Sequence, residues 1–156
     1  MTREVKLGGI CHNPNGNWMK QVARNMCDMW DGFLLGKKYI IHDRDPLFTH
    51  KFSMIMKSIG ITCKTTTPRQ PNMNAYIESF IGSFKSECLN KLILTSKEQL
   101  CYIVQEYLEY YNHERPHYGL EGAMIKPYPQ DPDGEIMEFS RLGGLLLSYR
   151  RVKTAA

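Results

Sequence analysis

Residues 38–45 read KYIIHDRD, a short apolar run that ends in two acidic side chains. The run over residues 38–42 is rich in β-branched side chains and too short for a helix, so it predicts a buried strand. Asp43 and Asp45 follow it in a polar turn. Because α/β sheets bind their ligands at the C-terminal ends of strands, Asp43 falls at a position suited to a functional site.

The residues before this run predict a strand and a helix. Val5 and Leu7 alternate with charged residues, which favours a short strand, and Asn13-Pro14 is typical of a helix start. Apolar side chains then recur at helical spacing and predict one buried stripe. The stripe consists of Trp18, Val22, Met26 and Trp30.

The residues after this run continue the alternation. A short helix over 52–59 and a β-rich segment over 61–66 precede a helix from about Asn74 to Leu92. Ser96 and Gln99 fit a capping box that opens the next helix. The helix from Asn74 is expected to bury Ile77, Ile81, Phe84 and Cys88. Strands that alternate with helices indicate an α/β fold.

The end of the chain has a different pattern. Prolines break any long element after Pro116. Residues 134–152 then predict two short strands about Gly143-Gly144.

Composition narrows the class of protein. The chain has 156 residues, of which 42% are hydrophobic and 23% charged, as in ordinary globular domains. This balance argues against a disordered tail, a fibre or a coiled coil. No apolar run is long enough for a membrane span, and no secretory signal follows Met1, so a cytoplasmic protein without a membrane partner is expected. The five cysteines are scattered, which indicates free thiols rather than a zinc site.

The charge is unevenly distributed along the chain. The formal net charge is +4, yet residues 96–140 carry three basic and nine acidic side chains. The basic front half and basic tail could bind a polyanion. Charge alone fits an ordinary solvated surface equally well.

Glu78 is the second acid of interest. It follows Asp43 after 34 intervening residues and is predicted on the helix face opposite the apolar stripe. One helix, one strand and a loop fit between the two acids, so the two carboxylates could converge at one edge of the sheet. Two such oxygen ligands suit Mg²⁺ or Mn²⁺ and two-metal phosphoryl transfer. On spacing alone, two independent solvated acids explain the pattern as well.

From Asp43 to Leu120 the chain resembles the catalytic core of retroviral-type integrases and of the bacterial insertion-sequence transposases related to them. The matching residues occur at consistent offsets over about half of the chain. They are His42-Asp43-Arg44-Asp45 with Phe48, Pro68-Arg69-Gln70-Pro71, Asn74-Ala75-Tyr76-Ile77-Glu78, Lys85, Glu87-Cys88-Leu89, and Tyr111-Asn112-His113-Glu114-Arg115-Pro116-His117.

The resemblance implies a ribonuclease-H-like fold, an Asp-Asp-Glu triad, Mg²⁺ or Mn²⁺ as cofactor, and DNA as partner. Asp43 matches the second acid of the triad and Glu78 the third. Lys85 matches a lysine that contacts the DNA end, although a lysine on an exposed helix face can equally be solvated. Asn74 and Arg69 are further DNA-contact candidates, but a helix cap would explain Asn74 and a position on the loop surface would explain Arg69. The family works as multimers, so a homo-oligomer or a complex with a full-length transposase is expected, as is a location at the nucleoid.

Two further positions of the resemblance imply structure rather than chemistry. Arg115 and His117 are expected to belong to a turn that closes the last helix. The segment is therefore a candidate for holding the fold together.

The chain also departs from the family pattern. The first acid of the triad should lie on a strand upstream of Val5, and the sequence contains no such strand. We therefore expect a sheet without its first strands, a partial integrase-type core over residues 1–122, and a basic extension with a short β-hairpin over 123–156.

Three functions stay open on the sequence. The first is a core for DNA integration or transposition that is inactive alone because one acid is absent. The second is a non-catalytic DNA-binding or oligomerising partner of a full-length transposase. The third is a metal-dependent nuclease that uses Asp43, Asp45 and Glu78. Whether this chain is itself an enzyme is therefore left open.

Overall fold

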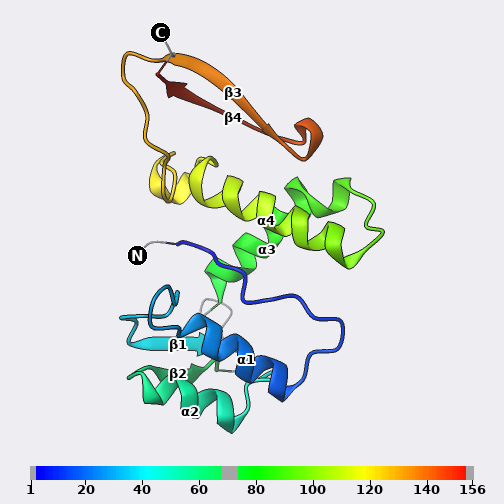
Figure 1. The fold of residues 1–156 in the computed structure, drawn as a ribbon, viewed down its shortest axis with the longest axis vertical. Helices are drawn as coiled ribbons and strands as arrows, with labels where there is room; N and C mark the ends of the chain where they lie inside the picture. The colour runs from blue at the N-terminus through cyan, green and yellow to red at the C-terminus, as the bar shows by residue number, and fades with distance from the viewer. Residues whose placement is uncertain (1–2, 68–73, 154–156) are drawn as a thin grey trace. The chain divides into compact units, whose positions relative to one another are not determined.

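The computed structural model describes residues 3–67 and 74–153, and its class is α/β, as predicted (Figure 1). The helices are α1 (Gly16–Met26), α2 (His50–Ser58), α3 (Ala75–Glu87) and α4 (Lys97–His113). The strands are β1 (Tyr39–His42), β2 (Thr62–Thr65), β3 (Glu135–Arg141) and β4 (Leu146–Val152). Three short 3₁₀ turns are η2 (Leu89–Lys91), η3 (Tyr118–Leu120) and η4 (Leu142–Gly144). No helix in the described ranges is both long and apolar enough to cross a lipid bilayer.

The chain forms two compact units. The β1–β2 unit comprises Gly8–Glu78, and the α4 unit comprises Met1–Leu7 with Ser79–Ala156. The boundary falls within α3, just after Glu78. The division at residue 122 that the resemblance suggests remains a prediction.

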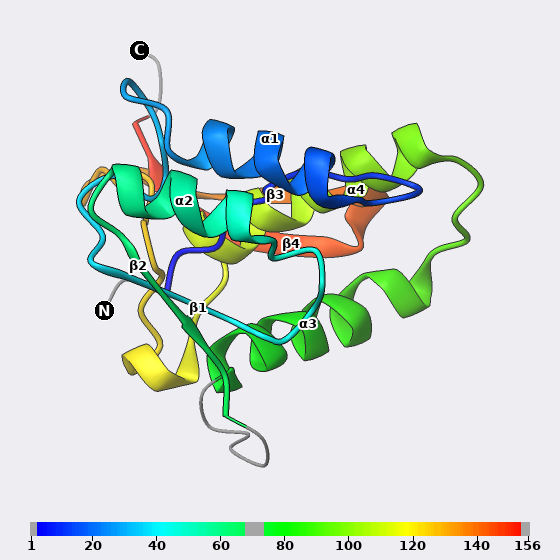
Figure 2. The ribbon, with the colours of Figure 1, turned by 90° about the horizontal axis from the view of Figure 1, so that it is seen from below.

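In the β1–β2 unit, two helices cover one side of a pair of parallel strands. β1 and β2 pair in register from Tyr39 opposite Thr62 to His42 opposite Thr65. Helices α1 and α2 lie on the same side of this pair (Figures 1 and 2). The core between them consists of Ala23, Phe52, Met56 and Ile61. This arrangement leaves the C-terminal end of β1 at the edge of the unit, directly before Asp43.

The bounds of α1 differ from the prediction at both ends. Asn15, not Asn13, caps the helix, because its side chain accepts hydrogen bonds from the N–H groups of Asn17 and Trp18. Trp30 lies beyond the helix and is 88% exposed, so its place in the core stripe was wrong. The reason is a turn in which the Asp28 carboxylate accepts the Trp30 N–H at 2.9 Å.

In the α4 unit, α4 lies between the hairpin of β3 and β4 on one side and α3 on the other (Figure 1). Its buried core consists of Cys88, Ile103, Tyr107, Tyr111 and Leu146. The antiparallel hairpin occupies the residues where the sequence predicts two strands. Gly143 and Gly144 connect the strands with φ values of +67° and +92°, a region that glycine enters without strain.

Two predictions for the α4 unit were wrong. Residues 5–7 form no strand with other main chain, because a side chain holds this segment instead. Ile77 and Ile81 are 45% and 42% exposed, so this half of the predicted stripe of α3 lies outside the core, whereas Cys88 is buried and Phe84 packs against the core, as predicted. Phe80 was not predicted; its ring and that of Phe84 pack against Tyr107.

Candidate functional site

Asp43 lies directly after β1, in an exposed turn that its own side chain helps to form. Its Oδ1 accepts the N–H of Asp45 at 3.2 Å, and the Oδ1 of Asp45 accepts the N–H of Leu47 at 2.8 Å. Carboxylates that bond to the backbone two residues later stabilise tight turns. Both aspartates therefore order the loop through Oδ1, and each keeps its second oxygen outside these local bonds.

The same turn is attached to the end of β2. The carbonyl oxygen of His42 accepts the N–H of Thr66 at 2.9 Å, and Arg44 Nε donates to the carbonyl oxygen of Thr66 at 3.3 Å. The main chain on both sides of Asp43 is thus tied to the neighbouring strand. A carboxylate on such an anchored turn loses little further conformational entropy when it binds a ligand.

Glu78 lies in the first turn of α3, and its side chain is exposed. Its N–H donates to the carbonyl oxygen of Asn74 at 3.0 Å, which places Asn74 at the start of the helix. No described residue forms a hydrogen bond or an ion pair with the Glu78 side chain. Its carboxylate is therefore available to a ligand from outside the described residues.

Lys85 lies in the last turn of α3, seven residues after Glu78 and exposed like it. Within the described part of the chain, no acidic side chain pairs with it. A lysine in the last turn interacts favourably with the helix dipole, which is the simplest explanation for its position. Arg69, the remaining DNA-contact candidate, lies outside the described residues.

The structure shows how far the predicted ligands come together. Over the described residues, no three His, Cys, Asp or Glu side chains form a group that could hold a metal ion. No contact joins Asp43 to Glu78 there either. Mg²⁺ often binds one or two carboxylates and completes its octahedron with water and substrate phosphate. The carboxylates of Asp43 and Glu78 suit a site of this kind. A cage of three carboxylates is not found among the described residues.

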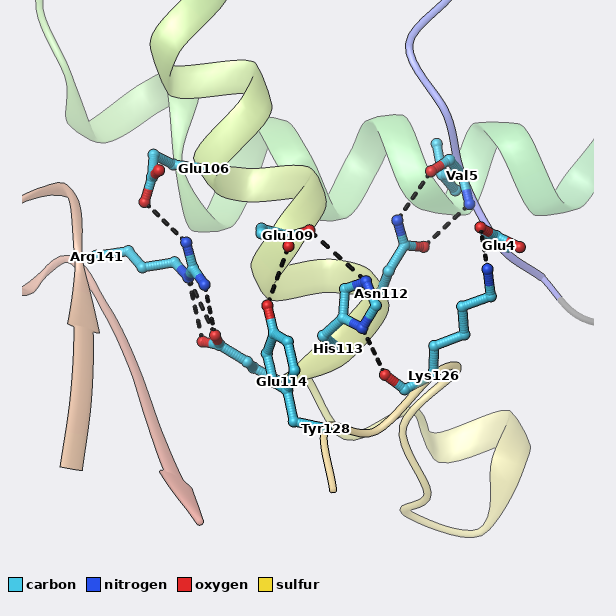
Figure 3. A network of polar contacts seen from close by, with 10 residues as sticks. All are labelled: Glu4, Val5, Glu106, Glu109, Asn112, His113, Glu114, Lys126, Tyr128 and Arg141. Carbon is cyan, nitrogen blue, oxygen red and sulfur yellow. Dashed lines mark hydrogen bonds and ion pairs between the residues drawn. The ribbon is translucent and has the colours of Figure 1, made fainter. Parts of the chain in front are cut away.

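The segment Tyr111–His117 holds the α4 unit together, because its side chains reach different segments (Figure 3). The Asn112 side chain bonds to both main-chain groups of Val5, at 3.0 and 2.9 Å. The His113 Nδ1 donates to the carbonyl oxygen of Lys126 at 2.6 Å, and its ring stacks on Tyr128. Lys126 in turn pairs with Glu4 at 2.7 Å. These contacts join residues 4–5 and residues 126–128 to the end of α4.

Glu114 holds the hairpin. Its side chain is 3% exposed and accepts hydrogen bonds from Arg141 Nη2 at 2.7 Å and Ser148 Oγ at 2.8 Å. Arg141 also contacts Glu106 at 3.0 Å (Figure 3). Burial raises the pKa of the Glu114 carboxyl, but the bonds from Arg141 and Ser148 outweigh burial and bring this pKa below its ordinary value. Glu114 is therefore a buried, charged anchor.

Arg115 holds the end of α3. Its Nη2 and Nε lie 2.6 and 3.0 Å from the two carboxylate oxygens of Glu87, a two-point contact. The fully buried Tyr107 donates to Glu87 as well, at 2.9 Å. Burial raises the pKa of Glu87, and the bonds from Arg115 and Tyr107 reverse this effect, so the net shift is downward.

His117 completes the turn after α4. Its Nε2 lies 2.8 Å from the carbonyl oxygen of Tyr111, to which it must donate, and its Nδ1 lies 3.4 Å from Arg115 Nη1. Burial lowers the pKa of His117, and the charges of Arg115 and Arg3 lower it further. Arg115 and His117 are structural, as expected. The roles of Glu87 and Glu114 were missed, because their arginine partners lie 28 and 27 residues away in the sequence, respectively.

Comparisons with known proteins relate this chain to proteins of mobile elements. Residues 59–124 match the family model of the integrase core domain. An uncharacterized 39.2 kDa protein of insertion element IS476 from Xanthomonas euvesicatoria is 40% identical over 76 residues, which are 48% of this chain and 22% of that protein. An uncharacterized 31.7 kDa protein of insertion element IS407 from Burkholderia multivorans is 34% identical over 84 residues, or 53% of this chain and 30% of that protein. A transposase-like protein of Haemophilus influenzae is 34% identical over 122 residues, or 76% of this chain and 54% of that protein.

These similarities define the class of protein. Residues 59–124 match the integrase core domain, and the chain is similar to proteins of bacterial insertion elements. These similarities relate the chain to mobile elements and DNA recombination. The aligned part of the chain spans between 22% and 54% of the length of these relatives.

Proposed function

We propose that this chain carries part of the catalytic core of a DNA integration or transposition enzyme with a ribonuclease-H-like arrangement. The observation that supports this most is the match of residues 59–124 to the integrase core domain, because it includes Glu78, Lys85 and the segment Tyr111–His117. Asp43, at the end of β1, precedes this stretch at the spacing typical of the family. In this proposal the protein acts on chromosomal DNA and is located at the nucleoid.

In this proposal Asp43 and Glu78 hold Mg²⁺ or Mn²⁺. Both are exposed carboxylates, and their residue type suits a hard cation. The bound ion would supply charge neutralisation at the reacting phosphate. Lys85 pairs with a phosphate of the DNA end, and Asn74 and Arg69 contact the DNA nearby. The Lys85 contact is not sequence-specific, because phosphate contacts carry no base information.

The reaction is strand transfer. A 3′ hydroxyl oxygen bonds to a target phosphorus atom and its proton passes to solvent. The bond from that phosphorus to the target's 3′ oxygen breaks, and the released 3′ oxygen takes up a proton from solvent. No side-chain nucleophile takes part, so the protein contributes position and charge. The anchored turn before Leu47 fixes Asp43, and the helix start at Asn74 fixes Glu78. Lys85 orients the DNA end through a phosphate.

The test measures Mn²⁺ binding by the relaxation of water protons, with and without a short DNA duplex. We expect Mn²⁺ to bind more tightly when DNA is present, and Asp43→Asn or Glu78→Gln to remove this gain. Asp133→Asn and Glu135→Gln are matched controls, since both acids are exposed and far along the chain from the site. If the two site variants bind Mn²⁺ and DNA as the wild type does, the proposal is wrong.

A second candidate function rests on the finding that, over the described residues, no three acidic or other ligating side chains form a group that could hold a metal ion. A chain that brings two carboxylates and a DNA contact could assist a full-length transposase without catalysing strand transfer itself. DNA binding that survives in Asp43→Asn, with plasmid joining only when a full-length relative is added, would favour this function. The nuclease alternative has less support, because it needs Asp43, Asp45 and Glu78 together and no such group of three is found among the described residues.

A further inference from the structure

His42, the last residue of β1, has a side chain whose place is fixed on two sides. Its ring stacks on Phe48 with the ring centres 4.3 Å apart and an angle of 24° between the planes. Its edge contacts Phe52, 6.1 Å away, and Phe48 and Phe52 contact each other at 5.1 Å. Phe52 belongs to the buried core of the β1–β2 unit. Packing against these two rings therefore fixes the position of the imidazole.

The ring nitrogen of His42 faces the residue that follows it. His42 Nδ1 lies 2.6 Å from the carbonyl oxygen of Asp43. A carbonyl oxygen only accepts, so Nδ1 carries the hydrogen in this contact. The hydrogen bond fixes the peptide group that follows Asp43, and with it the rotation about the Cα–C bond of Asp43.

This bond adds to the anchors on either side of Asp43. The carbonyl oxygen of His42 is bonded to Thr66, and Arg44 is bonded to the same residue. Without the His42 contact, the carbonyl oxygen of Asp43 would accept no hydrogen bond from the described residues. Loss of a group that holds a metal ligand in place typically lowers metal affinity about 10- to 100-fold.

We propose that His42 is a positioning residue, which orients the Asp43 carboxylate for metal binding without touching the metal. This inference rests on the proposed function, since it takes Asp43 as a metal ligand. The ring stacking and the hydrogen bond are separate properties of His42. Phenylalanine can stack on Phe48 but has no donor, whereas the side-chain nitrogen of asparagine occupies nearly the place of Nδ1.

The experiment compares His42→Phe and His42→Asn with the wild type, by Mn²⁺-induced relaxation of water protons in the presence of DNA. We expect His42→Phe to weaken Mn²⁺ binding by roughly 10-fold, in line with the loss of an outer-shell partner. His42→Asn should restore most of this affinity. Thermal unfolding of each variant reports the effect on packing, and His50→Phe, at an exposed histidine of the same unit, is the matched control.

Each outcome decides the question. Wild-type affinity in His42→Phe overturns the inference, provided that Asp43→Asn has lost binding in the same assay. Equal losses in His42→Phe and His42→Asn, in step with lower unfolding temperatures, also overturn it, because ring packing would then explain the effect. If Asp43→Asn binds Mn²⁺ as the wild type does, the metal site itself is wrong, and the role of His42 is rejected with it.

Discussion

The side chain of Asn112 bonds to both main-chain groups of Val5, 107 residues earlier in the chain. Its Oδ1 accepts the Val5 N–H at 3.0 Å, and its Nδ2 donates to the Val5 carbonyl oxygen at 2.9 Å. The Asn112 amide thus forms the two main-chain hydrogen bonds that a neighbouring strand would form with this segment. The residues before Gly8 are held to the end of α4 by a side chain rather than by a sheet.

The Asn112 contact predicts a specific loss of stability. Asn112→Ala leaves the N–H and the carbonyl of Val5 without these partners in a half-buried place, and each orphaned group costs about 1–3 kcal/mol. We expect the free energy of unfolding in urea to fall by about that amount. Asn112→Asp should show an intermediate loss, because it keeps only the acceptor. Asn90→Ala, at an exposed asparagine, should leave stability unchanged.

The Glu114–Arg141 pair predicts a non-additive effect. Arg141→Met leaves the Glu114 carboxylate buried without its main partner, a change that typically costs about 3–5 kcal/mol. The double variant Arg141→Met, Glu114→Leu should recover much of this loss, because the buried carboxylate is gone and Glu106, which also loses Arg141, is partly exposed. Urea unfolding of the two single variants and the double variant forms the cycle that measures the coupling. Additive losses would show that the pair contributes little.

His117 predicts that stability falls in mild acid. Its pKa is lowered in the folded protein, so below about pH 6.5 the unfolded chain takes up a proton that the folded chain does not. Folding stability should therefore fall as the pH drops from the ordinary histidine pKa toward the lowered one. The nearby charges are Arg115 and Arg3, which oppose protonation, and Glu87, which favours it. His117→Asn should flatten the dependence of the unfolding midpoint on pH, whereas His12→Asn, at an exposed histidine, should not.

Local patterns predicted the elements but not the contacts between them. The apolar run before Asp43 and the cap at Ser96 correspond to β1 and the start of α4. Trp30 was misplaced because the Asp28 side chain forms a turn that helical spacing does not reveal. Ile77 was misplaced because two apolar faces of α3 competed, and the aromatic one packed on α4. The partners of Asn112, Glu87 and Glu114 depend on the tertiary fold, so sequence spacing carries no signal for them.

Lys85 predicts how salt affects DNA binding. A lysine that neutralises one phosphate releases about one counterion, so its loss changes the slope of log K against log salt by about 0.9. We expect Lys85→Ala to weaken binding to a duplex end and to reduce the slope by about that amount, equally for unrelated sequences, since a phosphate contact reads no base. Lys97→Ala, at an exposed lysine in the first turn of α4, is the matched control and should leave the slope unchanged. Binding measured by fluorescence anisotropy across a salt series distinguishes the cases. An unchanged slope in Lys85→Ala would mean that this lysine only balances the dipole of α3.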